Sequence, residues 1–340
     1  MTTATSQTAL LDDVQLTAKR ILDLVSPELE LVEAEFERQA RSNIQVIAYI
    51  GDYLRRSGGK RVRPALTILS NYAAGGDGAN QSSIRMATVM EFLHTATLVH
   101  DDVIDKAETR RNRPSINSEF GNQTAVLMGD WLYMSAFETS LAERSLPILD
   151  ILTAVTRKMT EGELLQLTLL GRTDISEEQY FDVIARKTAY LFSACCEIGA
   201  LLGNADAETQ RNLRDYGMNL GVAFQLIDDL LDFTGTEEVL GKPAGADLLE
   251  GKVSLPLIFL LQRAPELRSA LQTVISEASY ASMTRASLWE AMQESGALQV
   301  AFERANEYAT AARLSLNGLN ESPYAQVLSS IPAYIVERDR

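Results

Sequence analysis

The sequence contains few of the residues that cross-linked or redox-active proteins need. Its 340 residues include only two cysteines, Cys195 and Cys196, which are adjacent within an apolar stretch. Neighbouring cysteines are poorly placed for an ordinary stabilising disulfide. We therefore expect both thiols to be reduced and buried, as in a cytoplasmic protein.

Long apolar runs and a positive net charge are also absent. Residues 1–20 lack the apolar centre of a signal peptide, and no uninterrupted apolar run approaches the roughly 18 residues of a transmembrane helix. We therefore expect no transmembrane segment. The 46 acidic residues exceed the 31 basic ones, for a formal net charge of -15, which argues against binding to nucleic acid. A diphosphate would be repelled as well, so it would require clustered basic residues and divalent metal.

The sequence has ample material for a hydrophobic core. Hydrophobic residues make up 46% and charged residues 23%, a composition typical of globular proteins. Apolar residues recur mainly at spacings of three and four, and the alternation typical of strands is scarce. We therefore predict an all-helical protein. We expect residues 1–340 to form one domain, with residues 1–13 flexible.

Glycine, proline and capping residues bound the expected helices. Gly75-Gly76-Asp77-Gly78 predicts a loop, and the glycine-rich stretch Gly235–Gly251 predicts a mobile flap. Two helices are expected within Val14–Leu54, separated near Ser26-Pro27. Further helices are predicted from Ser82 or Ser83 to about Lys106 and over Asn122–Glu143, Ile148–Leu170, Glu177–Leu202, Glu208–Phe233 and Leu255–Arg263.

Two acidic motifs of the form DDxxD end two of these helices. Three carboxylates within five residues, at the negative end of a helix dipole, repel one another unless a cation is present. Carboxylate oxygens are ligands suited to Mg²⁺, which typically bridges them to phosphate oxygens. The candidate metal-binding residues are Asp101, Asp102 and Asp105 in the first motif and Asp228, Asp229 and Asp232 in the second.

One such motif alone would be weak evidence, because an acidic cluster on a helix is more often a solvated surface. Here each motif follows an apolar helical stretch, His94–His100 before the first and Val222–Ile227 before the second. The helices should therefore carry both motifs inward. We interpret them as two metal clamps that hold a diphosphate between them.

Basic residues occur near both motifs, in a chain that is otherwise acidic. Any one of them could be an ordinary surface cation, but their clustering favours phosphate binding by bidentate Arg and mobile Lys side chains. The two histidines, His94 and His100, are six residues apart on a helix and do not face each other, which argues against a catalytic pair. The candidate diphosphate-binding residues are Lys60, Arg63, Arg110, Arg111, Lys187, Lys242 and Lys252.

These motifs resemble those of the trans-type isoprenyl (polyprenyl) diphosphate synthases. The matching segments extend in order from about residue 50 to the C-terminus, and Asn112 departs from the pattern, since the family commonly has Gly there. The segments are GGKRVRP at Gly58–Pro64, FLHTATLVHDDVID at Phe92–Asp105, RR at 110–111, FGN at Phe120–Asn122, KTA at Lys187–Ala189, FQLIDDLLDF at Phe224–Phe233, GKPAGADLLEGKVSLP at Gly241–Pro256 and the final ERDR.

The resemblance implies an isoprenoid synthase fold, a helical bundle around a deep central cavity, and a homodimer. It implies Mg²⁺ as cofactor, three ions when diphosphate is bound, with Asp101, Asp105 and Asp228 as direct ligands and the other three aspartates in support. The implied isopentenyl diphosphate pocket contains Lys60, Arg63, His94 and Arg111, the implied allylic diphosphate site contains Arg110, Lys187, Lys242 and Lys252, and the oxygens of Thr188 and Gln225 would face the carbocation.

The implied reaction is a head-to-tail condensation of isopentenyl diphosphate with an allylic diphosphate, such as farnesyl or geranylgeranyl diphosphate. In this family the residues before the first motif form the floor of the product tunnel. Small side chains at Ala96 and Thr97, with Leu93 and Met90 deeper, favour a product longer than farnesyl, of the octaprenyl or solanesyl type. Met128, Trp131, Met134 or Phe137 could form the next stop, although apolar residues at such spacings are more often plain core.

Two other functions stay open at this point. A class I terpene cyclase also uses an acidic motif and Mg²⁺, but its second motif is typically different and it has no need of a second diphosphate pocket. A non-catalytic subunit of a heteromeric synthase usually lacks aspartates or the GGKR segment, and this sequence retains both.

Overall fold

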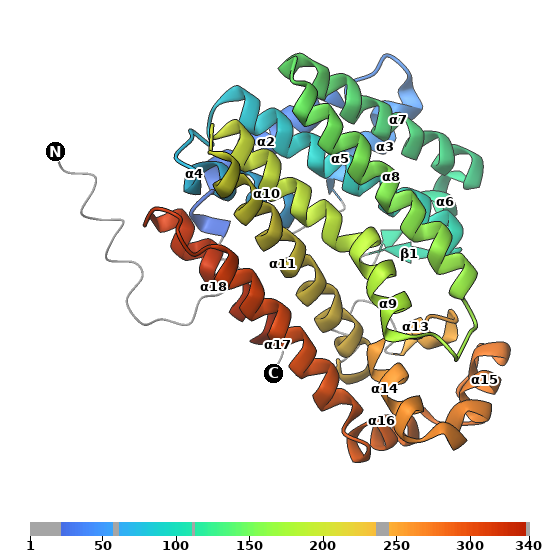
Figure 1. Ribbon diagram of the computed structural model, residues 1–340. Coiled ribbons are helices and arrows are strands. Elements are labelled where there is room, and N and C mark those ends of the chain that lie inside the picture. The colour runs from blue at the N-terminus through green and yellow to red at the C-terminus, as the bar shows by residue number, and fades with distance from the viewer. Residues whose placement is uncertain (1–21, 57–60, 111–112, 236–244, 338–340) are drawn as a thin grey trace.

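The computed structural model is a bundle of long helices with a smaller group of short helices at one end (Figure 1). It describes residues 22–56, 61–110, 113–235 and 245–337, so the predicted flexibility of residues 1–13 lies outside the described residues. The helices of the N-terminal half are α2 (Ser26–Gln39), α3 (Gln45–Arg56), α4 (Val62–Ala73), α5 (Gln81–Ile104), α6 (Ile116–Phe120), α7 (Asn122–Ser140), the 3₁₀ turn η2 (Leu141–Glu143) and α8 (Leu146–Leu169).

The C-terminal half also consists mostly of helices. Its elements are α9 (Glu177–Ile184), the π-turn η3 (Ala185–Ala189), α10 (Tyr190–Leu202), α11 (Ala207–Thr234), α13 (Ala246–Leu249), α14 (Leu255–Arg263), the 3₁₀ turn η4 (Pro265–Leu267), α15 (Arg268–Glu277), α16 (Arg285–Glu294), α17 (Ala297–Ser315) and α18 (Pro323–Glu337). The one sheet among the described residues is a two-residue ribbon, β1 (Thr109–Arg110) antiparallel to β2 (Arg113–Pro114). The predicted all-helical fold is therefore confirmed.

Helix α10 lies at the centre of the bundle, with α4 and α11 packed against it. Glycines allow this close packing, since a Cβ at Gly199 of α10 would lie 2.4 Å from the carbonyl oxygen of Thr67 in α4. On the other side, a Cβ at Gly217 or Gly221 of α11 would lie 2.5 Å from main-chain atoms of the helix that contains α10. Such contacts are possible only where the two backbones approach directly. They fix the position of α11, which carries the second DDxxD motif.

The core is built mostly from these central helices. Phe92 of α5, Phe192 of α10 and Tyr216 of α11 are among the largest fully buried side chains. Cys195 and Cys196 are buried and free, as predicted, and burial raises the pKa of both thiols, that of Cys196 to about 12. None of the helices in the described part of the chain has the length and apolar character that crossing a membrane requires.

The observed elements agree with the predicted ones except at five places. The helix of the first motif begins after Asn80, whose side chain accepts a hydrogen bond from the amide of Ser83, so Ser82 and Ser83 are not the N-cap. The break predicted near Ser26-Pro27 is present, since residues 22–23 are helical, residues 24–25 form a turn and α2 begins at Ser26 with proline in its first turn. The second helix predicted there is itself interrupted at residues 40–44, before α3. A short helix, α13, lies within the stretch Gly235–Gly251 that was predicted to be a flap.

The other two differences lie close to the motifs. The connection that follows the first motif contains the β1–β2 ribbon, which no alternating pattern in the sequence indicated, and residues 111–112 lie outside the described part of the chain. The single helix predicted over Glu177–Leu202 is interrupted by the π-turn η3, which contains Lys187 and Thr188. No glycine or proline marks this interruption in the sequence, and π-turns of this kind occur frequently at functional sites.

Candidate active site

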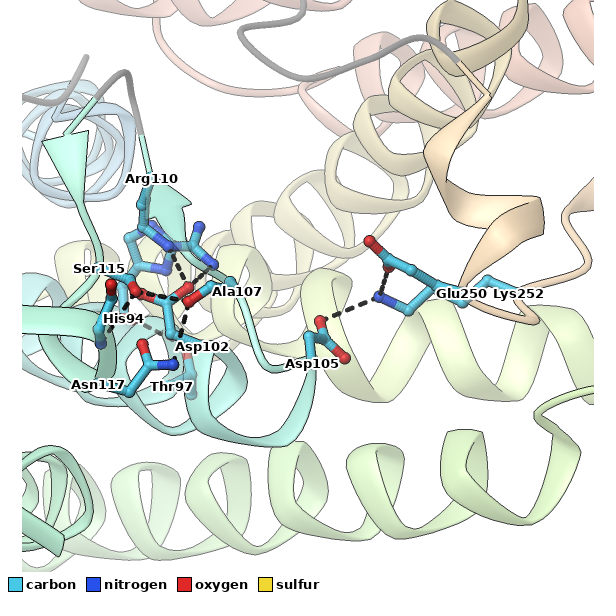
Figure 2. Close-up of polar contacts among 11 residues, drawn as sticks. His94, Thr97, Asp102, Asp105, Ala107, Arg110, Ser115, Asn117, Glu250 and Lys252 are labelled. Carbon is cyan, nitrogen blue, oxygen red and sulfur yellow. Dashed lines mark hydrogen bonds and ion pairs between the residues drawn. The ribbon is translucent and has the colours of Figure 1, made fainter. Parts of the chain in front are cut away.

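The first aspartate motif occupies the C-terminal turn of α5, and Asp102 is its most buried member. Asp102 is 3% exposed and accepts a hydrogen bond from Nε of Arg110, at 2.7 Å from its Oδ1 (Figure 2). The chain turns back after α5 through a bond of 2.9 Å from the amide of Ala107 to the carbonyl of Asp102, and this brings β1 beside the motif. Burial raises the pKa of Asp102, and the charge and hydrogen bond of Arg110 oppose that rise.

Asp101 faces a different set of charges, from helix α8 and the π-turn η3. Its pKa is raised to about 7, first by burial and then by the charge of Glu163 of α8, and the charge of Lys187 of η3 opposes the rise. Lys187 lies 2.8 Å from a carboxylate oxygen of Glu163 and donates a hydrogen bond of 2.9 Å to Oε1 of Gln166. Asp101 is therefore a crowded carboxylate whose ionised form requires more positive charge than Lys187 supplies.

Asp105 is paired with a lysine from a distant part of the sequence. Nζ of Lys252, in the loop before α14, lies 3.0 Å from Oδ2 of Asp105 and 2.7 Å from Oε2 of Glu250 (Figure 2). Burial alone would lower the pKa of Lys252, but Asp105 and Glu250 outweigh it and raise that pKa. The carboxylate of Asp105 thus binds a cation in this structure.

The second motif lies at the C-terminal end of α11, and Asp229 forms its main polar contacts. The hydroxyl of Tyr180 in α9 donates to Oδ2 of Asp229 at 2.6 Å, and Nε2 of Gln225 donates to Oδ1 at 2.8 Å. Oγ1 of Thr188 in η3 donates in turn to Oε1 of Gln225 at 2.8 Å. The pKa of Asp229 is raised to about 7, first by burial and then by the charge of Asp247, and the two hydrogen bonds oppose the rise.

Asp232 is held at the end of α11 by main-chain contacts. Its side chain is 1% exposed, and its carbonyl accepts a bond of 2.7 Å from the amide of Gly245. Nη2 of Arg285 in α16 donates to the carbonyls of Phe233 and Gly235 at 3.1 and 3.3 Å, and the hydroxyl of Tyr280 donates to the carbonyl of Gly245 at 2.8 Å. Burial and Asp232 raise the pKa of Tyr280 to about 12.

Three of the predicted diphosphate-binding residues, Lys60, Arg111 and Lys242, lie outside the described residues. The guanidinium of Arg63, in α4, lies 5.0 Å from the centre of the Phe192 ring. His94 lies half-buried on α5. His100 packs against Gly129 of α7, its Nε2 3.1 Å from the carbonyl of Val126, so it does not face His94.

The predicted tunnel-floor residues lie on the part of α5 that precedes the first motif. Met90, Leu93 and Ala96 are completely buried, and Oγ1 of Thr97 donates to the carbonyl of His94 at 2.7 Å. Helix α7 packs along α5. Of its four candidates for the next stop, Met128 is buried and Trp131 and Phe137 are partly buried, but Met134 is 61% exposed and lies outside the core of this chain.

The sequence analysis did not identify Glu163, Gln166 or Tyr180. Glu163 and Gln166 are three residues apart on α8, close to the buried Gly162. A glycine within a helix, followed by polar residues on one face, is the sequence pattern that could have identified them. A Cβ at Gly162 would lie 2.7 Å from Cβ of Arg186, which shows how closely α8 approaches η3. Tyr180 carries no such signal, because its partner Asp229 lies 49 residues away in the sequence.

The donor set fits a divalent cation that is shared with a substrate. Across the described residues, no group of three or more His, Cys, Asp or Glu side chains is close enough to hold a metal ion alone. The motifs nevertheless offer hard carboxylate oxygens. The pKa of Asp101 is raised despite the charge of Lys187, and the ammonium of Lys252 already occupies a cation position on Asp105. This pattern is suited to Mg²⁺, which typically uses one or two carboxylates together with phosphate oxygens and water.

Comparison with known proteins agrees with this geometry. Residues 44–292 match the polyprenyl synthetase family. The octaprenyl diphosphate synthase of Escherichia coli (strain K12) is 38% identical over 323 residues, which cover 95% of this chain and 99% of the relative. The all-trans-nonaprenyl-diphosphate synthase (geranyl-diphosphate specific) of Rhodobacter capsulatus is 34% identical over 319 residues, which cover 94% of this chain and 97% of the relative.

A solved structure shares the whole fold. The crystal structure of the polyprenyl synthase from Caulobacter crescentus CB15, complexed with calcium and isoprenyl diphosphate, superimposes with a TM-score of 0.90 at 34% identity. The match covers 96% of this chain and 100% of the other. With two aspartate motifs, their basic partners and a common fold, the chain therefore belongs to the polyprenyl synthetase family and is a prenyltransferase of the trans type.

Proposed function

We propose that this prenyltransferase is a Mg²⁺-dependent synthase of a long, all-trans polyprenyl diphosphate. The observation that carries the proposed length is the small, completely buried Ala96 on the helix before the first motif, with Leu93 and Met90 deeper on the same helix. The full-length match to the octaprenyl diphosphate synthase of Escherichia coli supports the same length class. The substrates would be isopentenyl diphosphate and an allylic diphosphate such as farnesyl or geranylgeranyl diphosphate, bound within a single domain.

The aspartates would bind the metal ions, and the basic residues would bind the two diphosphates. Asp101, Asp105 and Asp228 would bind Mg²⁺ directly, with Asp102, Asp229 and Asp232 in support, and three ions are expected when diphosphate is bound. Bound Mg²⁺ would supply positive charge to the departing diphosphate. The basic side chains Lys187, Arg110, Lys242 and Lys252 would hold the allylic diphosphate, and Lys60, Arg63, His94 and Arg111 the isopentenyl diphosphate.

The reaction requires no nucleophile from the protein. The allylic carbon–oxygen bond breaks and its electron pair leaves with the diphosphate. The double bond of isopentenyl diphosphate attacks the resulting cation and forms the new carbon–carbon bond, and a proton then passes to the released diphosphate. Thr188 and Gln225 would turn oxygen atoms toward the cation, and the apolar walls of the bundle would exclude water.

We also propose that the chain acts as a homodimer through α7 and α8. Large apolar side chains are exposed on these two helices, with Leu127 at 68%, Met134 at 61% and Leu164 at 60%. A surface with several such side chains favours burial against a second copy.

Replacing Leu127 and Met134 by Glu should yield a monomer in sedimentation analysis. Leu314→Glu is the control, because Leu314 is 56% exposed on α17, and a dimer that survives the α7 changes would contradict this interface.

Product length tests the proposed function. Purified protein with Mg²⁺, farnesyl diphosphate and labelled isopentenyl diphosphate should form all-trans products longer than geranylgeranyl diphosphate. No incorporation with any allylic primer would contradict the synthase function and favour a subunit that needs a partner. Release of a hydrocarbon instead of a longer diphosphate would favour a cyclase.

A second experiment tests the tunnel. Ala96→Phe should shorten the products, because the aromatic ring would fill space along the path of the growing chain. Ala96→Val makes a smaller change that the core tolerates more easily. Ala312→Phe is the control, since Ala312 is equally buried but lies on α17. Unchanged product length in both Ala96 variants would show that the tunnel floor lies elsewhere.

A further inference from the structure

Tyr180 is a buried tyrosine whose hydroxyl touches the second aspartate motif, and none of the sequence motifs includes it. Its side chain lies on α9 and is 5% exposed. Its hydroxyl donates to Oδ2 of Asp229 at 2.6 Å. A tyrosine hydroxyl carries its proton at neutral pH and can donate it to a carboxylate.

The carboxylate of Asp229 determines which way the amide of Gln225 points. Its Oδ1 accepts a hydrogen bond of 2.8 Å from Nε2 of Gln225, so the nitrogen of that amide faces Asp229. Oε1 of Gln225 is then turned toward Thr188, whose hydroxyl donates to it at 2.8 Å. Because the hydroxyl proton of Thr188 is directed to Gln225, the lone pairs of Thr188 are left for another partner.

The π-turn η3 makes this chain of contacts possible. In a regular α-helix each residue turns about 100°, so Tyr180 and Thr188, eight residues apart, would point about 80° apart. A π-turn absorbs one extra residue, which makes their separation equivalent to about seven residues and brings them within roughly 20° of one face. Both can therefore face α11 at once, as their bonds to Asp229 and Gln225 require.

The neighbouring residue in the π-turn points elsewhere. Lys187 contacts Glu163 and Gln166 on α8. Gly221 of α11 maintains the approach on the other side, because a Cβ there would lie 2.5 Å from Cα of Ala189. The turn therefore separates two tasks, with Lys187 directed to α8 and Thr188 to α11.

We propose that Tyr180 is a positioning residue for the condensation, acting through Asp229 and Gln225. It fixes the carboxylate of Asp229, which orients the amide of Gln225 and hence the hydroxyl of Thr188. This role rests on the proposed function, in which the oxygens of Thr188 and Gln225 face the carbocation. Without the hydroxyl of Tyr180, the carboxylate and the amide gain rotational freedom, and the oxygens would face the cation only part of the time.

Tyr180→Phe tests this role, because it removes one oxygen atom and keeps the ring. A hydrogen bond to a charged group contributes enough for a fall in kcat of about ten- to a hundredfold. The KM values for both substrates should change by less than about twofold, because no side chain that contacts diphosphate is altered. A rise in KM with kcat unchanged would overturn the proposal.

Tyr216→Phe is the matched control. Tyr216 is completely buried on α11, and its hydroxyl donates to the carbonyl of Leu328 at 2.8 Å. Both variants lose one buried hydroxyl, so both should lose a similar amount of thermal stability, but kcat should fall only in Tyr180→Phe. Equal effects of the two variants on kcat would mean that Tyr180 is merely structural.

A double-mutant cycle tests the route of action. Gln225→Leu should lower kcat by itself, and adding Tyr180→Phe should lower it little further, since both changes remove the same orientation. Additive losses would show that Tyr180 does not act through Gln225. The wild-type enzyme is measured in parallel, and absence of turnover there would contradict the proposed function instead of the role of Tyr180.

Discussion

Asp101→Asn should stabilise the metal-free protein at neutral pH while it removes most of the activity. Burial raises the pKa of Asp101 from an ordinary value of 3.8 to about 7, with Glu163 adding to the rise. A carboxyl whose pKa is higher in the folded state favours folding while it is protonated there. As the pH rises from about 4 to 7, the folded state must release that proton, and its stability falls.

The size of this effect follows from the shift. Each pKa unit corresponds to about 1.36 kcal/mol, so the charged Asp101 costs at most about 4 kcal/mol of unfolding free energy at pH 8. At pH 5 the same relation gives about 1.6 kcal/mol. The advantage of Asn over Asp should therefore grow by up to about 3 kcal/mol between pH 5 and pH 8. Asparagine has a similar shape and no proton to lose.

Urea unfolding in EDTA at pH 5, 6, 7 and 8 measures this difference. Asp206→Asn is the control, because hydrogen bonds from Thr209 lower the pKa of Asp206, and loss of that charge should not stabilise the protein. A difference between wild type and Asp101→Asn that does not change with pH would refute the reasoning. Mg²⁺ with diphosphate should then stabilise the wild type and have much less effect on Asp101→Asn.

Three further changes test how the site is supported. Gly221→Ala should cost about 1–3 kcal/mol in urea unfolding, because the new Cβ would lie 2.5 Å from the main chain of Ala189. Arg61→Met should cost about 3–5 kcal/mol, since Arg61 lies 2.6 Å from the buried carboxylate of Glu91, and adding Glu91→Gln should restore part of that loss. Arg285→Met removes bonds to two carbonyls at the end of α11, so the melting temperature should fall and half-saturation by Mg²⁺ should require more metal.

The helices were predictable where local signals and packing agree. Helix α14 spans Leu255–Arg263 as expected, because proline lies in its first turn and a buried apolar run follows. The helix of the first motif begins one or two residues from its predicted start, since Asn80, Ser82 and Ser83 are all competent caps and the local sequence does not rank them. Such boundaries depend on which cap the tertiary contacts favour.

The π-turn could not be predicted, because its cause lies on other helices. The residues of η3 include no helix breaker, and the turn instead faces Gly162 of α8 and Gly221 of α11 at close range. A helix in isolation would gain nothing from the extra residue. The contacts of Lys187 with α8 and of Thr188 with α11 stabilise the irregular turn.

The sequence indicated which residues form the candidate site, but not which of them contact one another. The aspartates were identifiable because carboxylates so close together require a cation. The structure adds that Lys252 contacts Asp105 across 147 residues of sequence, and that Arg110 returns to Asp102 after only eight. The pairing of Arg110 with Asp102 follows from a short turn. The pairing of Lys252 with Asp105 depends on how α13 and α14 pack against the bundle, which no local pattern encodes.

The contact between Gly245 and Asp232 joins two segments of the chain at the end of the second motif. The amide of Gly245 donates a hydrogen bond to the carbonyl of Asp232. Tyr280 donates to the carbonyl of Gly245, and Arg285 donates to the carbonyl of Phe233. The last carbonyls of a helix have no partner within the helix itself. Here the amide of Gly245 and the guanidinium of Arg285 bind the carbonyls of Asp232 and Phe233, so contacts from outside α11 fix the turn that carries the second motif.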